Sequence, residues 1–314
     1  KCYHKALSIK PDYSEAHNNL GNVLKKQGKL DEAVSSYRKA LAFKFDYAEA
    51  YSNLGGALTE LGKFDEAVVN YHKALSTKSN FAEAHYNLGN ALKGLGKLDE
   101  SIASYRKALS IRPNYASAYN NLGNAHQDQG RVDEAIKQMD MALSYKPGNA
   151  GWRIRRALFL PVVPSSQDDI EARRDTLSKA VAALIKENLT VQNPALDIGI
   201  TNFYLAYHGR NNRSLMQDIS KLYLGVSPKL AYEAKHCQSR QKAKKDVLRI
   251  GFLSAYFRDH TIGKLTRGII QHLSRDLFEV IIFRPPGKKD HMSEIIDQAA
   301  DKVVSLHKKL ERDR

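Results

Sequence analysis

Cysteine is nearly absent from this chain. Only Cys2 and Cys237 occur among its 314 residues, and they lie far apart in the sequence. Two such residues provide neither a disulfide framework nor the paired thiolates of a zinc site. Long hydrophobic runs are also lacking, since no stretch approaches the roughly 18 apolar residues of a membrane span, and no secretory signal opens the chain. We therefore expect a cytoplasmic protein with no membrane and no metal partner.

Several catalytic and cofactor-binding motifs are missing as well. The sequence has no G-x-G-x-x-G after a predicted strand and no Walker A motif, so neither a dinucleotide nor an ATP site is expected. Its histidines do not have metal-ligand spacing, and no G-x-S-x-G nucleophile motif occurs. These absences predict a protein without a resident cofactor.

Positive charge, in contrast, is abundant and unevenly distributed. The net charge is +15, of which residues 1–150 carry +4 and residues 151–314 carry +11. A basic surface can bind nucleic acid or another polyanion. A solvated surface together with the basic stretch 235–246 also explains the excess of positive charge, and we favour this interpretation over nucleic-acid binding. No nucleic-acid partner is expected.

Residues 1–149 repeat with a period of 34 residues. A leucine–glycine pair, a second glycine, an alanine and a tyrosine recur at this spacing, the pair beginning at Leu20, Leu54, Leu88 and Leu122. Such a period is typical of tetratricopeptide repeats, each of which forms two antiparallel helices. The predicted repeats are 14–47, 48–81, 82–115 and 116–149, and 1–13 corresponds to the second half of a preceding repeat. Because the array starts within a repeat, we expect the natural protein to be longer at its N-terminus.

Small and aromatic residues within each repeat have physical reasons to recur. We expect Gly21 and Ala40 to lie where the two helices cross closely, and Gly28 to allow the tight turn between them. Tyr37 and its counterparts are expected to fill the space between neighbouring repeats. The fourth repeat has Met139 at the tyrosine position.

Asparagines form two columns on the predicted first helices, which line the concave face of such a superhelix. An asparagine amide donates two hydrogen bonds and accepts through its carbonyl, so a column of amides can hold an extended peptide by its backbone. Inheritance by duplication, with the amides facing water, explains the period equally well. The first column is Asn19, Asn53, Asn87 and Asn121, and the second is Asn22, Asn90 and Asn124, interrupted by Gly56.

Residues 150–234 lose the period but keep helical patterns, and we interpret them as a helical bridge. A helix is expected from Gly151 to Leu160 and a longer one from Ser165 to Leu184, with short helices after them. Five arginines here could hold an anion, but we expect them on solvated helix faces: Arg153, Arg155, Arg156, Arg173 and Arg174. The basic, apolar-poor segment 235–246 is predicted to be a domain linker.

Residues 247–314 begin an α/β region. Val247–Leu253 and Phe278–Phe283 are apolar runs typical of buried strands, and a helical pattern between them places Ile262, Leu265, Ile269 and Leu273 on one face. A βαβ unit has parallel strands, and ligands lie at the carboxyl ends of such strands. His260 follows the first strand at this place, and histidine is suited to proton transfer near neutral pH. His260 is therefore the candidate catalytic residue.

The sequence RIGFLSAYFRDHTIGKL, from Arg249 to Leu265, followed by FEVIIF, resembles the start of the catalytic region of protein O-GlcNAc transferases. This is glycosyltransferase family 41, with its bacterial and plant Spindly-like branch. Tetratricopeptide repeats belong to the same family's architecture, so the resemblance extends over nearly the whole chain. It implies that the asparagine column holds acceptor proteins and that His260 lies in the active site.

The resemblance also implies a mainly α fold: a tetratricopeptide superhelix, the bridge, and the beginning of one Rossmann-like lobe of a two-lobed glycosyltransferase. The complete family members transfer N-acetylglucosamine from UDP-GlcNAc to Ser or Thr without a metal, although the Spindly-like branch also admits fucose. The donor is bound largely by the second lobe, which this chain lacks, so we expect the chain to be inactive alone. The alternatives are a non-enzymatic peptide-binding adaptor and, less favoured, an RNA-binding repeat protein. Besides acceptor proteins, a second copy of the chain is a candidate partner, in a homo-oligomer formed through the repeats.

Overall fold

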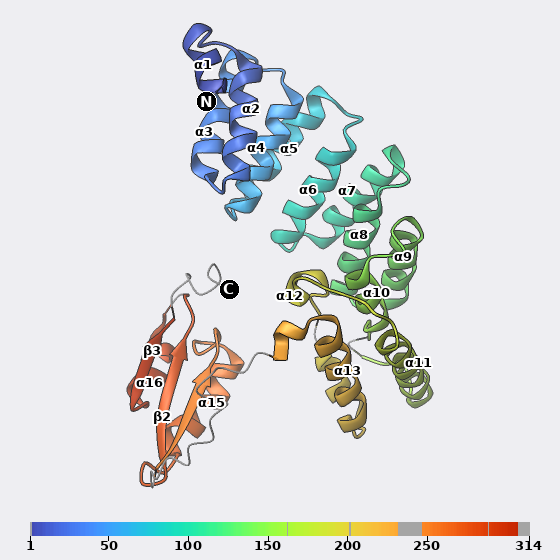
Figure 1. Cartoon of the computed structure of the whole chain (residues 1–314), viewed down its shortest axis with the longest axis vertical. Coiled ribbons are helices and arrows are strands. Elements are labelled where there is room, and N and C mark those ends of the chain that lie inside the picture. The colour runs from blue at the N-terminus through green and yellow to red at the C-terminus, as the bar shows by residue number, and fades with distance from the viewer. Residues whose placement is uncertain (1, 162, 201, 232–246, 288, 307–314) are drawn as a thin grey trace. The chain divides into compact units, whose positions relative to one another are not determined.

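The computed structural model describes residues 2–161, 163–200, 202–231, 247–287 and 289–306 (Figure 1). The chain divides into two compact units, Lys1–Tyr232 and Glu233–Arg314, and each is described by itself. The linker predicted at 235–246 and the chain end at 307–314 lie outside the described residues.

Paired antiparallel helices form the repeat part of the first unit, which confirms the mainly α, helical-repeat architecture predicted from the 34-residue period. One helix precedes four pairs, and each helix contacts the next along the chain. The helices are α1 (Cys2–Ile9), α2 (Ser14–Lys26), α3 (Leu30–Phe43), α4 (Ala48–Glu60), α5 (Phe64–Thr77), α6 (Ala82–Gly94), α7 (Leu98–Ile111), α8 (Ala116–Asp128) and α9 (Val132–Tyr145).

The glycine and the tyrosine that recur every 34 residues contact each other within a repeat. A Cβ added to Gly21 would lie 2.6 Å from Cε1 of Tyr37, and Gly89 stands in the same relation to Tyr105. Both tyrosine rings are fully buried. Tyr37 also belongs to the core cluster that contains Leu54 of the next repeat. The rings therefore lie between neighbouring repeats as expected, and they also pack on the glycine of their own repeat.

The turns inside the repeats depend on a second glycine. Gly28, Gly62, Gly96 and Gly130 all have φ near +75°, a left-handed conformation that other residues rarely adopt. At Gly62 the N–H donates to the Thr59 carbonyl at 3.0 Å, and the following N–H, of Lys63, donates to the Leu58 carbonyl at 2.9 Å. These bonds close the end of the first helix and direct the chain into the second.

The first helices of successive repeats lie on the inner side of the array. α2 contacts α4, α4 contacts α6 and α6 contacts α8, and each of these contacts is more extensive than any between successive second helices among the described residues. A stack whose first helices approach more closely than its second helices curves toward the first helices. The concave face is consequently lined by α2, α4, α6 and α8 (Figure 1).

The bridge packs its own hydrophobic core against the end of the array. Ile154, Leu177, Leu205 and Leu222 are among the buried residues of this core. The predicted first bridge helix ends three residues earlier than expected, at Ala157, and the following residues Leu158–Leu160 are buried without being helical. The bridge elements are α10 (Ala150–Ala157), α11 (Gln167–Ile185), α12 (Pro194–Asp197), η1 (Phe203–His208), α13 (Arg213–Val226) and η2 (Pro228–Ala231). In the described part of the chain no helix is both long and apolar enough to cross a membrane.

The second unit contains a three-stranded parallel sheet in the order β1-β2-β3. Its strands are β1 (Leu248–Leu253), β2 (Phe278–Arg284) and β3 (Lys302–Ser305). In register, Leu248 pairs with Phe278 and Ile281 pairs with Lys302. The helices α15 (Thr261–His272) and α16 (His291–Gln298) contact each other, so both cover the same face of the sheet.

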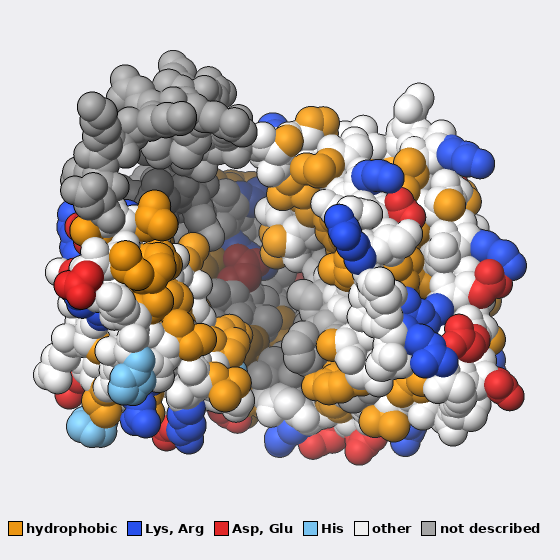
Figure 2. All heavy atoms as spheres, turned by 90° about the horizontal axis from the view of Figure 1, so that it is seen from below, with side chains coloured by type: hydrophobic (Ala, Val, Ile, Leu, Met, Phe, Trp, Pro, Cys, Tyr) orange, Lys and Arg blue, Asp and Glu red, His pale blue; other side chains and the backbone are white. Residues whose placement is uncertain are grey.

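Two expectations for this unit were wrong. β1 is not a buried strand: among the described strands it pairs only with β2, and Leu248 is 66% exposed. The apolar face predicted for the first helix is also wrong for most of its members. Leu273 packs on the core with the buried Ile270, whereas Leu265 is 71% exposed. Figure 2 shows hydrophobic side chains on one face of the molecule. The exposed hydrophobic residues of this unit include Leu248, Leu253, Ile262, Leu265, Ile269 and Leu277.

The Gly–Tyr contact predicts the effect of adding one methyl group. Gly89→Ala places a Cβ 2.6 Å from the buried ring of Tyr105, so we expect the free energy of unfolding to fall by about 1–3 kcal/mol. Gly225→Ala in α13 is the control, since nothing lies within 4 Å of its added Cβ, and it should be neutral or stabilising by up to about 1 kcal/mol. The free energies of unfolding of the wild type and both variants can be measured by urea unfolding. A Gly89→Ala variant as stable as the wild type would show that the Tyr105 ring moves aside without a loss of stability.

His208 is a buried histidine whose ring nitrogens bond to none of the described residues. It is 3% exposed. Burial, together with the positive charge of Arg174, lowers the pKa of His208, while Asp169 opposes this. Burial also lowers the pKa of His126, which is likewise buried in α8.

Stability should therefore fall in mild acid. An unfolded histidine binds a proton near pH 6.5, whereas the folded chain resists protonation of His208, so its stabilising contribution is complete above about pH 6.5 and is lost as the pH falls below it. We expect the melting temperature of His208→Leu to decline less between about pH 7 and about pH 5 than that of the wild type. The remaining decline is assigned to groups such as His126. A slope unchanged by the substitution would contradict this account.

Candidate functional site

The first asparagine column lies on the first helices, but its four members are not equivalent. Asn53 donates through Nδ2 to Oδ1 of Asn18 at 2.9 Å. Asn121 is fully engaged, since its Nδ2 donates to the Tyr86 hydroxyl and to Asn90 Oδ1, and its Oδ1 accepts from Asn120. Asn19 is exposed and its Oδ1 has only a 3.5 Å contact with Asn18 Nδ2. Asn87 is half-buried, and its amide makes no hydrogen bond with any described residue.

The second column is held in one orientation by the protein itself. Tyr37 donates its hydroxyl to Asn22 Oδ1 at 2.8 Å, and Tyr105 donates to Asn90 Oδ1 at 2.7 Å. Burial raises the pKa of Tyr37 to about 12, so this hydroxyl keeps its proton at any physiological pH. Asn124 has no such tyrosine, because Met139 stands at the corresponding position.

Arg155 takes the place of that tyrosine. Its Nη1 donates to Asn124 Oδ1 at 3.2 Å and to Asn120 Oδ1 at 3.4 Å. The other nitrogens donate to backbone carbonyls at the end of α12, those of Leu196, Asp197 and Ile198. Arg155 is only 8% exposed, and burial lowers its pKa. The expectation that all five bridge arginines are solvated was wrong for this residue.

The remaining four bridge arginines are engaged in surface contacts. Arg153 pairs with Glu187 at 2.5 Å, Arg156 with Asp140 at 2.8 Å, and Arg173 with Asp169 at 2.6 Å. Arg174 donates to Asn212 Oδ1 at 2.6 Å. Since each has a partner, these side chains do not form a grip for an anion.

A polar pocket of about 300 Å³ lies where the concave face meets the bridge. It is lined by Asn120, Asn121, Asn124, Asn149, Trp152, Arg155, Leu196 and Asp197. Two residues of the predicted columns, Asn121 and Asn124, thus meet side chains of the bridge here. No periodic signal in the sequence pointed to this pocket, because half of its walls come from outside the repeats.

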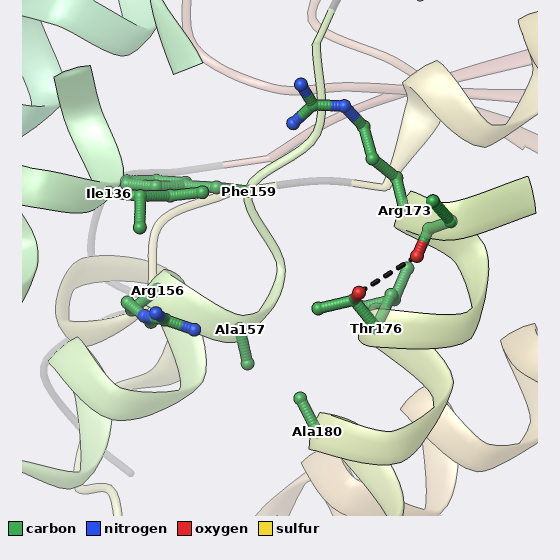
Figure 3. A pocket seen from close by; sticks show the side chains of 9 residues that line it. Ile136, Arg156, Ala157, Phe159, Arg173, Thr176 and Ala180 are labelled. Atoms are coloured by element: carbon green, nitrogen blue, oxygen red, sulfur yellow. Dashed lines mark hydrogen bonds between the residues drawn. The ribbon is translucent and has the colours of Figure 1, made fainter. Parts of the chain in front are cut away.

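A second, less polar pocket of about 170 Å³ lies between α9, α10 and α11 (Figure 3). Ile136, Phe159 and Ala180 contribute apolar side chains. The Thr176 hydroxyl at its wall donates to the Ala172 carbonyl at 2.8 Å, within α11. Arg156 and Arg173 at the pocket are already paired with carboxylates, so this pocket offers no group for a ligand and we assign it no function.

His260 lies immediately before α15, at the carboxyl end of β1. Its Nδ1 accepts a hydrogen bond from the Ile262 N–H at 3.2 Å, and its ring lies 4.6 Å from that of Tyr256. A ring nitrogen that accepts from a backbone N–H carries no proton, so a neutral His260 has its proton on Nε2. In this geometry His260 can donate a hydrogen bond from Nε2, while Nδ1 caps the helix.

The loop that carries His260 is held by residues that sequence reasoning missed. Arg284, at the end of β2, donates to the Phe257 carbonyl at 3.0 Å and forms an ion pair with Asp297. Ser293 donates its hydroxyl to the same carbonyl at 2.9 Å. Asp290 accepts from the Asp259 N–H at 2.7 Å, and this lowers the pKa of Asp290 together with its cap of α16. A charged residue ending an apolar strand, as in FEVIIFR, was the available signal.

Residues 1–130 match a family model described as TPR repeat, in the stretches 1–28, 21–59, 55–96 and 90–130, and residues 116–149 match one described as Tetratricopeptide repeat. The N-terminal part of this chain is a tetratricopeptide-repeat array. A comparison with curated proteins found no match.

Several solved structures are similar to the chain. MamA is 30% identical over 47% of this chain and 86% of MamA, with a TM-score of 0.44. YrrB, described as a TPR protein with an unusual peptide-binding site, is 21% identical over 58% of this chain and 90% of YrrB, with a TM-score of 0.47. The first TPR of Spaghetti (RPAP3), bound to an HSP90 peptide, is 28% identical over 37% of this chain and 92% of that structure, with a TM-score of 0.37.

These comparisons concern the tetratricopeptide repeats, and none indicates the O-GlcNAc transferase family in particular. The recurring tyrosines Tyr37, Tyr71 and Tyr105 are buried in the repeat core, so these three rings are not available to stack on RNA bases. Among the described residues, no group of histidine, cysteine, aspartate or glutamate side chains is arranged to hold a metal ion.

Proposed function

We propose that the tetratricopeptide array binds an extended segment of a partner protein along its concave face. The observation that carries this proposal is the supply of unused amide groups on the first helices. Asn87 has its whole amide available, and Nδ2 of Asn22, Asn90 and Asn124 bonds to none of the described residues while their oxygens are occupied. Amides of this kind bond to a peptide backbone regardless of the peptide's side chains.

The position of these groups supports a peptide ligand over a small molecule. The asparagines belong to α2, α6 and α8, so they follow the length of the array instead of converging on one cavity. A ligand that uses all of them must itself be long and must repeat its hydrogen-bonding groups. An extended polypeptide meets both requirements.

Asn87→Ala tests this function. Each lost hydrogen bond to a bound backbone is worth about 0.5–1.5 kcal/mol, so we expect Asn87→Ala to weaken binding of peptides selected on the wild type from a random library by about two- to tenfold. Asn114→Ala is the matched control, since Asn114 is exposed in the turn between α7 and α8. Equal affinities for the wild type and Asn87→Ala, measured by calorimetry, would remove Asn87 from the binding surface.

A second candidate function concerns the C-terminal unit. We propose that the chain is a fragment of a protein O-linked N-acetylglucosamine transferase, whose repeats bind the acceptor protein. The support is the resemblance of Arg249–Leu265 to the family's catalytic region, together with the placement of His260 at the carboxyl end of a parallel strand. UDP-GlcNAc is then the donor of the complete protein, which needs a second lobe. The non-enzymatic adaptor is the alternative, and it shares the peptide-binding face.

His260 separates these alternatives. In this chain joined to a donor-binding lobe, we expect His260→Asn to abolish sugar transfer to a Ser/Thr peptide, because asparagine keeps the helix cap but lacks the imidazole. His260→Ala removes both groups and should also destabilise α15. Peptide binding by the repeats is expected to stay unchanged in both variants. Transfer that survives in His260→Asn would exclude a chemical role for the imidazole and leave it as a cap.

A further inference from the structure

We propose that Arg155 is a positioning residue that fixes the polarity of the second asparagine column at Asn90 and Asn124, so that these amides present N–H donors and the bound peptide is held there by its backbone carbonyl oxygens. This inference rests on the proposed peptide binding and adds the chemical groups by which the peptide is recognised. An amide column without fixed polarity would accept donors and acceptors equally. A column of fixed polarity selects one of them.

The orientation of two amides follows from the chemistry of arginine. A guanidinium has five N–H donors and no acceptor, so the atoms of Asn120 and Asn124 that lie 3.4 and 3.2 Å from Arg155 Nη1 must be their carbonyl oxygens. The Nδ2 group of Asn124 therefore points away from Arg155, at the wall of the 300 Å³ pocket. Arg155 cannot release these oxygens easily, because its other nitrogens are bonded to the carbonyls at the end of α12.

The orientation of Asn120 determines the orientation of the next amides along the array, because each amide hydrogen-bonds to the next. Asn120 has its oxygen toward Arg155, so its Nδ2 donates to Asn121 Oδ1 at 2.8 Å. Asn121 in turn donates to Asn90 Oδ1, also at 2.8 Å. Asn90 then has its oxygen occupied by Asn121 and by the Tyr105 hydroxyl, and only its Nδ2 group is left for a ligand. One buried cation in the bridge thus orients an amide on the preceding repeat.

The remaining positions of the second column have the same polarity by other means. Tyr37 donates to Asn22 Oδ1, which leaves Asn22 Nδ2 free of described partners. Where the column is interrupted at Gly56, the Lys25 ammonium lies 3.1 Å from the position that a Cβ would take. An ammonium is also a donor without an acceptor. The column accordingly offers donors at Asn22, Lys25, Asn90 and Asn124.

Charge favours neutral carbonyls over carboxylates as the acceptors. Lys25 is paired with Glu60 at 3.0 Å, which offsets its charge. The pocket beside Arg155 is also lined by Asp197, whose carboxylate accepts from the Asn193 N–H at 3.0 Å. A surface whose cations are already compensated attracts a polar, uncharged partner, and the carbonyls of an extended peptide recur along its length as the donors do along the array.

Asn124→Asp is the decisive substitution. The aspartate keeps an oxygen toward Arg155 and gains an ion pair there, so we expect its melting temperature to equal or exceed that of the wild type. Its second oxygen replaces the Nδ2 donor and repels a carbonyl, so we expect the affinity for peptides selected on the wild type from a random 12-residue library to fall at least tenfold. Asn114→Asp, which makes the same charge change in an exposed turn, should bind them normally.

Each result has a distinct meaning. Asn124→Asp binding as tightly as the wild type, while Asn124→Ala binds weakly, would show that the amide accepts from the peptide and would overturn the proposed polarity. Failure of the wild type to select any peptide would overturn peptide binding itself. Unchanged binding in both Asn124 variants would remove this residue from the surface and would overturn the polarity proposal while leaving Asn87 to test the function.

The role of Arg155 has its own readout. A thioamide in place of a peptide bond weakens the acceptor and strengthens the donor, so thioamide analogues of a selected peptide should bind the wild type several-fold more weakly than the parent. In Arg155→Gln the two amides lose the Nη1 donor, and the glutamine amide can both donate and accept, so their polarity is no longer fixed. We expect this ratio to approach one even where both affinities fall. A ratio equal to that of the wild type would show that Arg155 only stabilises the fold.

Discussion

The contact between a glycine and a tyrosine ring inside each of the first three repeats is the interaction on which the array and its concave face both depend. The ring of Tyr37 fits against Gly21 because the glycine has no Cβ, and the same contact recurs between Gly89 and Tyr105. It brings the two helices of a repeat close together and buries the ring. It also places the Tyr37 hydroxyl between the two helices, where it donates to Oδ1 of Asn22 on the concave side at 2.8 Å. The packing of the repeat and the orientation of the asparagine amide are therefore set by one side chain.

The sequence predicted the repeat helices well because their determinants are local and recur four times. A 34-residue period, a glycine with left-handed φ at each turn and buried small residues at each crossing are sufficient to place the paired helices. The same reasoning placed the asparagines on the first helices. It did not reveal that the Asn121 amide is fully hydrogen-bonded within the protein while the Asn87 amide bonds to no described residue. This difference depends on which neighbouring side chains lie within reach of each amide.

Arg155 is the clearest case of a residue whose environment could not be predicted from the sequence. It stands in a run of basic residues, WRIRR, where a solvated helix face is the ordinary expectation. Its burial results from α12, which lies about forty residues further along the chain and turns its last carbonyls toward the guanidinium. In the C-terminal unit the strand positions were predicted, but the order β1-β2-β3 places β1 at an edge, so an apolar run typical of a central strand is exposed there. Arg284 and Ser293, which hold the loop before His260, likewise act across elements that no local pattern connects.

The replacement of tyrosine by Met139 in the fourth repeat has a consequence for how such an array can change over time. In the first and third repeats the donor that orients the second-column asparagine belongs to the same repeat, so a duplicated copy of either repeat would keep the orientation of that amide. In the fourth repeat that donor is supplied by Arg155 of the bridge. The last repeat and the bridge therefore depend on each other. Repeats can be inserted or deleted upstream without affecting this contact, but a repeat inserted between Met139 and Arg155 would leave Asn124 without its donor unless both positions changed.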